Sequence, residues 1–139
     1  MKAIYAVFDT NVLVSSLLSK RSDSPTVILL DWVVDGDIVL LYNEEIVAEY
    51  EEVLHRPKFG FDEPDIQTVL ELVRSGLCLY RTTSNELFLD EDDAVFYEVA
   101  ISKEDAFLVT GNLRHFPKAY MVVSPAQMFE IVKKQISVG

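Results

Sequence analysis

Several features that identify protein classes are scarce in this 139-residue chain. The single cysteine, Cys78, excludes a disulfide within the chain, and its apolar neighbours indicate a small core residue of a reduced protein. The two histidines, His55 and His115, lie far apart, so the chain has no zinc-binding spacing. The five glycines are scattered, which excludes a glycine-rich phosphate-binding loop.

Long hydrophobic runs are missing as well. No apolar run approaches the roughly 20 residues that a membrane span needs. The N-terminus has no succession of basic segment, long apolar region and small-residue cleavage site, so no signal peptide is visible. We therefore expect a cytoplasmic protein with no membrane partner.

Basic residues are few. Lysine and arginine number 12 against 23 acidic residues, which gives a net charge of −11. This balance argues against a broad basic surface for nucleic acid, because Lys and Arg supply most of the non-specific affinity for phosphates. It remains compatible with an enzyme that engages phosphates through a bound divalent cation, and it suits a basic protein partner.

Short apolar runs alternate with helical patterns along the whole chain. This alternation predicts a parallel sheet covered on both faces, with right-handed crossovers. We expect a single α/β domain over residues 1–139, a three-layer α/β/α structure with a central parallel sheet of four to five strands. The expected strands are 3–8, 38–42, 77–80, 106–110 and 120–123, and the expected helices are 11–18, 25–34, 43–55, 62–75, 90–102 and one from 125 onward.

The first apolar run ends in an acidic residue. Asp9 follows the strand expected at 3–8, and the carboxyl end of such a strand is where open α/β sheets bind ligands. Asn11 is predicted to be the N-cap of the next helix. On this stretch alone, a role for Asp9 and Asn11 in capping a turn stands level with a functional role.

A second acid is out of place on a helix. Asp93 precedes Phe96 and Tyr97 by three and four residues, which puts it on the apolar face of the helix 90–102. An ionised carboxylate on such a face costs several kcal/mol unless it is paired or binds a metal. A functional role is therefore the better interpretation for Asp93.

A third acid is less well defined. Glu49 and Glu51 flank opposite borders of the apolar stripe in helix 43–55, and the spacing does not choose between them. Together with Asp9 and Asp93, such a glutamate can converge at one edge of a parallel sheet. Clustered carboxylates repel one another, and a divalent cation such as Mg²⁺ relieves that repulsion.

Four segments in order resemble one protein family. They are Val7-Phe8-Asp9-Thr10-Asn11, Ala48 to Leu54 followed by Arg56-Pro57-Lys58-Phe59, Asp92-Asp93 leading to Val99-Ala100, and Leu108 to Pro117. The chain resembles the PIN domain family over nearly its whole length, and in particular the VapC-like toxins of toxin–antitoxin systems.

This resemblance implies a Mg²⁺- or Mn²⁺-dependent endoribonuclease. It implies that Asp9, Glu49 (rather than Glu51) and Asp93 are the metal ligands and catalytic residues. The fourth acidic position of the family falls on Asn112, which is a departure. A neutral amide offers a metal less charge, so this departure weakens a second metal site more than the first.

The resemblance also implies supporting residues and partners. The residues that would orient ligands and water are Thr10, Asn11 and Thr110. The residues that could position RNA are Arg56, Lys58, Arg114, His115, Lys20 and Arg21. Each of them can equally be interpreted as a solvated surface cation. The implied partners are an RNA substrate, a cognate antitoxin protein and a second copy of the chain in a homodimer.

Two alternatives remain. One is a PIN-like fold, weakened at Asn112, that acts as a binding protein without catalysis. The other is a haloacid-dehalogenase-like phosphohydrolase, because Asp9-Thr10-Asn11 resembles an aspartate nucleophile motif at a strand end. That chemistry needs a second acid where Asn11 stands, so it is the weaker alternative.

Overall fold

The computed structural model describes residues 2–138. In chain order its elements are β1 (Ile4–Phe8), α1 (Thr10–Leu18), α2 (Pro25–Asp35), β2 (Ile38–Tyr42), α3 (Glu44–Leu54), α4 (Glu63–Arg74), β3 (Leu77–Cys78), α5 (Glu91–Ala100), β4 (Phe107–Val109), the 3₁₀ turn η1 (Leu113–His115), β5 (Val122–Val123) and α6 (Pro125–Val138). The alternation of strands and helices is the one expected from the hydrophobic pattern, and β2 has the predicted bounds.

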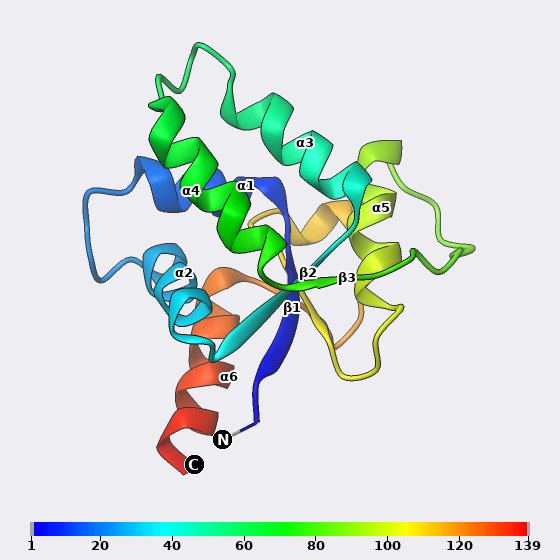
Figure 1. The fold of residues 1–139 in the computed structure, drawn as a ribbon. Coiled ribbons are helices and arrows are strands. Elements are labelled where there is room, and N and C mark those ends of the chain that lie inside the picture. Colours follow the sequence, from blue (N-terminus) through cyan, green and yellow to red (C-terminus); the bar gives the residue numbers. More distant parts are fainter. Residues whose placement is uncertain (1, 139) are drawn as a thin grey trace.

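The strands of residues 2–138 form one five-stranded parallel sheet in the order β3-β2-β1-β4-β5. β1 is central, and its Ala6 pairs with Leu40 on one side and Phe107 on the other. Helices α1, α2, α4 and α6 lie on one side of the sheet and α5 on the other, while α3 crosses above the end of β1 (Figure 1). The predicted three-layer α/β/α fold is confirmed.

The core explains why β1 and β2 read as uninterrupted apolar runs. Both strands have neighbours on each side and helices on each face, so nearly every side chain is enclosed. Phe8, Leu41 and Leu108 are essentially inaccessible to solvent. Because β1 is fixed on all sides, the residue that follows it is held in a defined place.

Helix α1 begins earlier than predicted. Its N-cap is Asp9, whose carboxylate accepts a hydrogen bond from the Thr10 N–H at 2.8 Å, so the prediction of Asn11 as N-cap is wrong. The extended backbone of Asp9 ends the strand, and the helix starts at the next residue. Helices α3 and α5 begin close to where they were expected, and their N-caps are Asn43, which accepts from the Ile46 N–H, and Asp90, which accepts from the Asp92 N–H.

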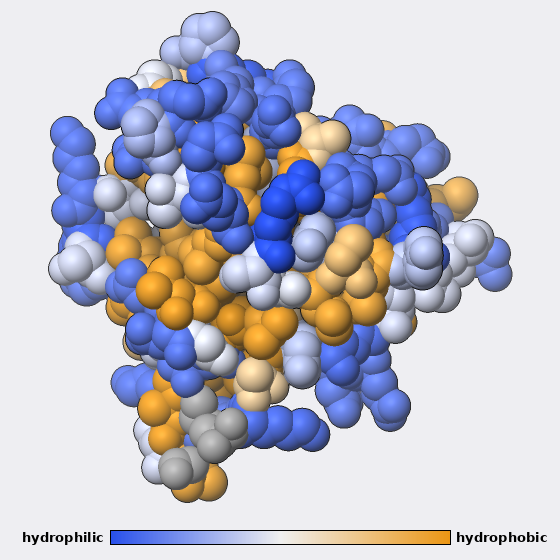
Figure 2. All heavy atoms as spheres, viewed as in Figure 1, coloured by the Kyte–Doolittle hydropathy of each residue, from blue (hydrophilic) through white to orange (hydrophobic). Residues whose placement is uncertain are grey.

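The edge of the sheet at β3 contradicts one prediction. Cys78 is exposed rather than buried, because β3 has a neighbour only on its β2 side. In Figure 2 hydrophobic side chains gather around the middle of this face, where Figure 1 places β3, and polar ones cover α3 above it. An apolar sequence around a cysteine does not distinguish a core strand from an exposed edge strand.

Gly76 follows helix α4 and lies against the backbone of β2. Ser75 is the C-cap, and a Cβ on Gly76 would lie 2.0 Å from the Leu40 carbonyl oxygen. The chain therefore needs glycine here to pass against the backbone of β2.

No helix within residues 2–138 combines the length and the apolar character that crossing a membrane requires.

Candidate active site

Asp9 is buried where β1 ends and α1 begins, and only 7% of it is exposed. Its Oδ2 accepts hydrogen bonds from the Thr110 hydroxyl at 2.7 Å and from the Asn11 side-chain amide at 3.2 Å. Its Oδ1 accepts from the Thr10 N–H. Burial raises the pKa of Asp9 above its usual value, although these hydrogen bonds oppose the shift. The carboxylate is thus fixed in orientation, and within residues 2–138 it forms no ion pair, although the charge of His115 also lowers its pKa.

A second loop is tied to the same carboxylate. Thr110 follows β4, and its hydroxyl accepts a hydrogen bond from the Asn112 N–H at 2.9 Å while donating to Asp9. The Gly111 N–H donates to the Asn11 side chain at 3.1 Å. The ends of β1 and β4 are adjacent in the sheet, which explains why residues a hundred positions apart meet here. The side chain of Asn112 is exposed next to this junction.

Tyr50 connects helix α3 to the end of β1. Its ring is fully buried, and its hydroxyl donates a hydrogen bond to the Phe8 carbonyl oxygen, immediately before Asp9. Burial and the Asp9 carboxylate raise the pKa of Tyr50 well above its usual value, so the hydroxyl stays a donor. The apolar stripe of the helix places Tyr50 in the core but does not reveal this contact.

Asp93 lies in the first turn of α5, close to Asp9. Burial, the charge of Asp9 and the charge of Asp90 raise the pKa of Asp93 to about 6. The His115 Nδ1 lies 3.4 Å from Oδ2 and opposes that shift. This distance allows attraction but exceeds that of a normal hydrogen bond, and the buried Oδ2 has no hydrogen-bond partner among residues 2–138. Asp93 is therefore a confined carboxylate whose Oδ2 faces the His115 ring without a hydrogen bond of normal length.

Glu49 lies in a neighbouring groove rather than with these two acids. The half-buried side chain projects from α3 into a groove of about 550 Å³ that is also lined by Glu52, Arg56 and Asp92. Burial, Asp92 and Glu52 raise the pKa of Glu49, whereas Arg56 lowers it. Within residues 2–138, no three His, Cys, Asp or Glu side chains come close enough together to hold a metal ion. The structure brings Asp9 and Asp93 together and leaves Glu49 apart.

The pair formed by Asp9 and Asp93 fits a divalent cation. A carboxylate has about four acceptor positions, and Asp9 uses three of them in hydrogen bonds. Asp93 has an unsatisfied buried oxygen, and in the described part of the chain neither acid pairs with lysine or arginine. Mg²⁺ binds oxygen ligands and commonly uses one or two carboxylates, with waters and phosphates in its other positions.

One comparison with known protein families gave a match. Residues 5–114 match the PIN domain family, a range that contains Asp9, Glu49, Asp93 and Asn112. The chain belongs to the PIN domain family. A comparison with curated proteins gave no match. PIN domains are generally nucleases that use divalent metals, which is consistent with a pair of carboxylates at the end of the central strand.

The cations predicted to position RNA lie in different places in this PIN domain. Arg56 forms an ion pair with Glu52 at 2.8 Å, and the Lys58 amine lies 5.1 Å from the centre of the Phe59 ring. His115 faces Asp93, whereas Arg114 is exposed and has no ion pair within residues 2–138. Two further candidates from the sequence also point to solvent: Lys20, and Arg21 paired with Asp23.

One buried acid of the PIN domain escaped the sequence analysis. Glu98, on α5, is only 8% exposed, and its carboxylate accepts from Arg81 Nε at 2.8 Å and from the Ser84 N–H at 2.9 Å. Glu98 follows Ala94 and Val95 by four and three residues, the same spacing that singled out Asp93. Helix α5 is buried on more than the face through Phe96, because Ala94, Val95 and Glu98 are enclosed as well.

Proposed function

We propose that this PIN domain is a Mg²⁺- or Mn²⁺-dependent endoribonuclease in which Asp9 and Asp93 hold the metal. The observation that carries the proposal is the buried Asp9 close to the half-buried Asp93, both with raised pKa values and, within residues 2–138, with His115 nearby but no lysine or arginine to neutralise them. Ionising both in the absence of a cation is costly, because burial and mutual repulsion each disfavour the charged form. A hard divalent cation supplies the missing compensation.

The side chains around this pair have distinct tasks in the proposal. When bound, the cation would activate a water for attack on an RNA phosphodiester and stabilise the charge that develops there. Thr110 and Asn11 keep the Asp9 carboxylate in one orientation, and the Thr10 N–H holds its other oxygen. Glu49 and Asn112 complete the catalytic set that the family pattern implies, with Glu49 acting from the neighbouring groove.

We also propose the biological setting implied by the resemblance to VapC-like proteins. The PIN domain would be the toxin of a toxin–antitoxin pair, kept inactive by a cognate antitoxin and assembled as a homodimer. The net charge of −11 favours a basic antitoxin. Induced expression should then arrest growth with the wild-type chain and not with Asp9→Asn, and sedimentation should give twice the mass of one chain.

The segment after the family match is proposed to be part of the same domain. β5 pairs with β4, and α6 packs against α2, so both contact the region matched to the PIN family. Limited proteolysis should accordingly give no stable fragment that ends near residue 114.

The proposal is tested by measuring cleavage of a mixture of RNAs by the wild-type chain while Mg²⁺ or Mn²⁺ is titrated in, with and without EDTA. The same assay is run with Asp9→Asn. Metal-dependent cleavage by the wild-type chain that EDTA and Asp9→Asn abolish supports it. Cleavage by Asp9→Asn at the wild-type rate overturns it.

One alternative has an observation in its favour. Glu49 lies apart from Asp9 and Asp93, and the fourth acidic position is Asn112, so the charge around a metal is lower than the family pattern implies. The second candidate function is therefore a PIN-fold binding protein without catalysis. Calorimetry that finds no Mn²⁺ binding at millimolar metal would favour this function over the nuclease.

A further inference from the structure

A pocket of about 260 Å³ shares two residues with the candidate active site. Asn11, whose side-chain amide donates to the Asp9 carboxylate at 3.2 Å, lines this pocket, and so does Asn112, whose N–H donates to the Thr110 hydroxyl. The other lining residues are Val12, Ser15, Thr26, Gly111 and Pro125. A ligand in the pocket would therefore touch side chains that adjoin the Asp9 carboxylate directly.

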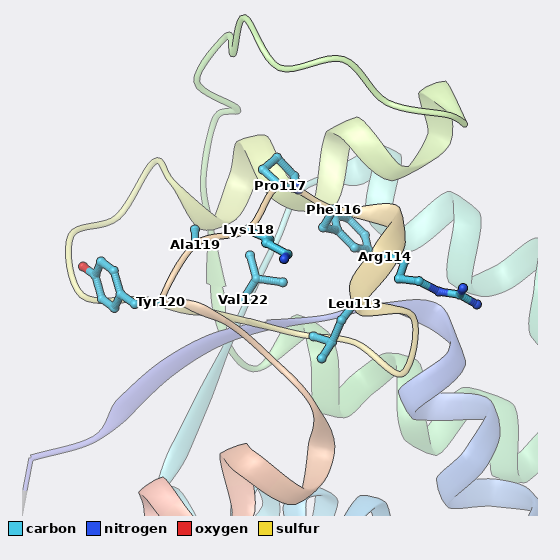
Figure 3. Close-up of a pocket in the computed structure, with 8 residues that line it drawn as sticks. All are labelled: Leu113, Arg114, Phe116, Pro117, Lys118, Ala119, Tyr120 and Val122. Atoms are coloured by element: carbon cyan, nitrogen blue, oxygen red, sulfur yellow. The ribbon is translucent and has the colours of Figure 1, made fainter.

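The pocket lies where the chain leaves the sheet in two directions. β1 is followed by β2 on one side, whereas the adjacent β4 is followed by β5 on the other side. After β1 the chain enters α1 on one face of the sheet (Figure 1). After β4, Phe116 packs against Phe88, which packs against Tyr97 of α5, and Figure 3 shows Phe116 on the α5 side of this segment. Open α/β sheets bind ligands in the crevice that such a divergence leaves at the carboxyl ends of the strands.

The chemistry of the lining narrows the kind of ligand. The lining offers amides and hydroxyls, and it contains neither a charged nor an aromatic side chain. A phosphate would enter without a lysine or arginine to balance its charge, and a base would find no ring on which to stack. The pocket therefore suits a neutral group that carries hydroxyls, which in a nucleotide is the sugar.

Several hydrogen-bonding groups of the pocket are left free by the protein. The buried Thr26 hydroxyl lies 3.2 Å from the Ser15 hydroxyl and 3.3 Å from the Ser24 hydroxyl. These contacts are the only hydrogen bonds of the three hydroxyls within residues 2–138, so at least one of their three hydrogens remains for a ligand. The side-chain amide of Asn112 is exposed, and it can both donate and accept. A ribose 2′-hydroxyl also donates and accepts, and it distinguishes RNA from DNA.

The proposed reaction gives a reason for such a contact. A metal-activated water attacks the phosphodiester, so the 2′-hydroxyl forms no bond during cleavage. A nuclease of this kind selects RNA over DNA by how it binds the sugar and not by the chemistry of cleavage.

We propose that this pocket is a ribose subsite of the nuclease, in which Ser15, Thr26 and Asn112 bind the 2′-hydroxyl of the nucleotide whose phosphate lies at Asp9. This inference rests on the proposed function, because it names how the same site recognises RNA. It also gives the departure at Asn112 a role, since an amide donates and accepts whereas an ionised carboxylate only accepts. Asn11 connects the subsite to the carboxylate pair.

Fluorescence anisotropy with labelled RNA and DNA of the same single-stranded sequence, in EDTA to prevent cleavage, tests the subsite. The wild-type chain should bind the RNA about fivefold more tightly, as expected for one hydrogen-bonded hydroxyl. Ser15→Ala should reduce this preference to about twofold by weakening RNA binding while DNA binding stays the same. The matched control is Ser16→Ala, which removes a hydroxyl bonded to the Leu13 carbonyl oxygen outside the pocket and should keep the full preference.

Two further measurements sharpen the test. Thr26→Val should also reduce the preference for RNA, and urea denaturation checks that this buried substitution leaves the fold intact. If it does not, Ser15→Ala still decides, because Ser15 is exposed. An RNA in which a single 2′-deoxynucleotide is moved along the strand should bind more weakly at one position than at the others.

Three results would overturn the subsite. The first is equal affinity of the wild-type chain for RNA and DNA. The second is the same preference for RNA in Ser15→Ala as in Ser16→Ala. The third is an RNA affinity that does not depend on where the 2′-deoxynucleotide stands.

Cleavage separates failure of the subsite from failure of the proposed function. If the wild-type chain cleaves RNA, Ser15→Ala should raise the KM for RNA with little change in kcat. Equal KM values for Ser15→Ala and Ser16→Ala would refute the subsite while the nuclease stands. If the wild-type chain cleaves no RNA, the proposed function fails, and the anisotropy comparison still decides whether the pocket distinguishes ribose from deoxyribose.

Discussion

Two acids on helix α5 are buried to a similar degree, yet their surroundings differ. The side chains of Asp93 and Glu98 are 15% and 10% exposed. Although burial alone would raise its pKa, Glu98 receives hydrogen bonds from the Ser84 N–H and from Arg81, and its pKa is lowered. Asp93 has one oxygen without a hydrogen bond, and its pKa is raised to about 6.

This difference in hydrogen bonding shows which of the two acids stabilises the fold without a metal ion. Glu98 is satisfied by its neighbours and joins α5 to the segment that contains Arg81 and Ser84. Asp93 lies close to Asp9, and the His115 ring 3.4 Å away only partly offsets the rise in its pKa, which costs stability in the metal-free protein. Such local conflicts with stability are expected at functional sites.

The largest expected effect is a loss of RNA cleavage on neutralising Asp93 but not on neutralising Asp92. Asp93→Asn should reduce metal-dependent RNA cleavage by about 10²–10³-fold, because a metal contributes several kcal/mol to stabilising the transition state. The control is Asp92→Asn, which removes the same charge from an exposed residue. Initial rates for both variants measure the difference, and equal losses would contradict the roles assigned here.

The next prediction compares how neutralising Glu98 and neutralising Asp93 change the free energy of unfolding. Glu98→Gln should lower the free energy of unfolding by about 2 kcal/mol, less than for a fully buried ion pair because Arg81 is 35% exposed. Asp93→Asn should leave metal-free stability unchanged or raise it. Urea denaturation in EDTA measures both, with Glu91→Gln on an exposed part of α5 as the control. A large destabilisation by Asp93→Asn would remove the contrast.

The same contrast predicts how stability depends on pH. Because the pKa of Asp93 is raised, the folded metal-free protein binds a proton near pH 6, before the unfolded chain does. The free energy of unfolding should therefore rise by about 1–2 kcal/mol as pH falls from 7 toward 4.5. Glu98, with its lowered pKa, adds stability that is lost only at lower pH. In Asp93→Asn the free energy of unfolding should change little between pH 7 and pH 4.5. Thermal unfolding of both proteins across this range measures the difference, and an equal rise in the variant would contradict the prediction.

The smallest effect concerns Glu49. It lies in the groove with Asp92 and Arg56, apart from the other two acids, so Glu49→Gln should reduce cleavage only about tenfold. Initial rates of RNA cleavage by Glu49→Gln and by Asp93→Asn, measured in the same assay, provide the comparison. A loss as large as that of Asp93→Asn would mean that Glu49 moves to join the metal when it binds.

Much of the fold could be predicted because it follows from local patterns. The apolar runs of β1 and β2 and the cap residues Asn43 and Asp90 each specify an element without distant contacts. The environment of Cys78 could not be predicted, because burial of a strand depends on whether a neighbouring strand covers it.

The candidate site was predictable only in part. The position of Asp9 at a strand end and the helical phase of Asp93 drew attention to two acids, and the structure places Asp9 directly after β1 and Asp93 in the first turn of α5, where the charge of Asp9 raises its pKa. The hydroxyl of Thr110 and the ring of His115 approach these acids through the order of the strands, which spacing along the chain does not encode. The direction in which Glu49 projects also depends on how α3 packs against α5.

The central claim is that Asp9 and Asp93 together hold a divalent cation, and Mn²⁺ titration calorimetry tests it most directly. The wild-type chain and Asp92→Asn should bind Mn²⁺ with similar affinity, and Asp93→Asn should bind it at least tenfold more weakly. Equal Mn²⁺ affinities for Asp93→Asn and Asp92→Asn, or no binding by the wild-type chain at millimolar metal, would contradict the account.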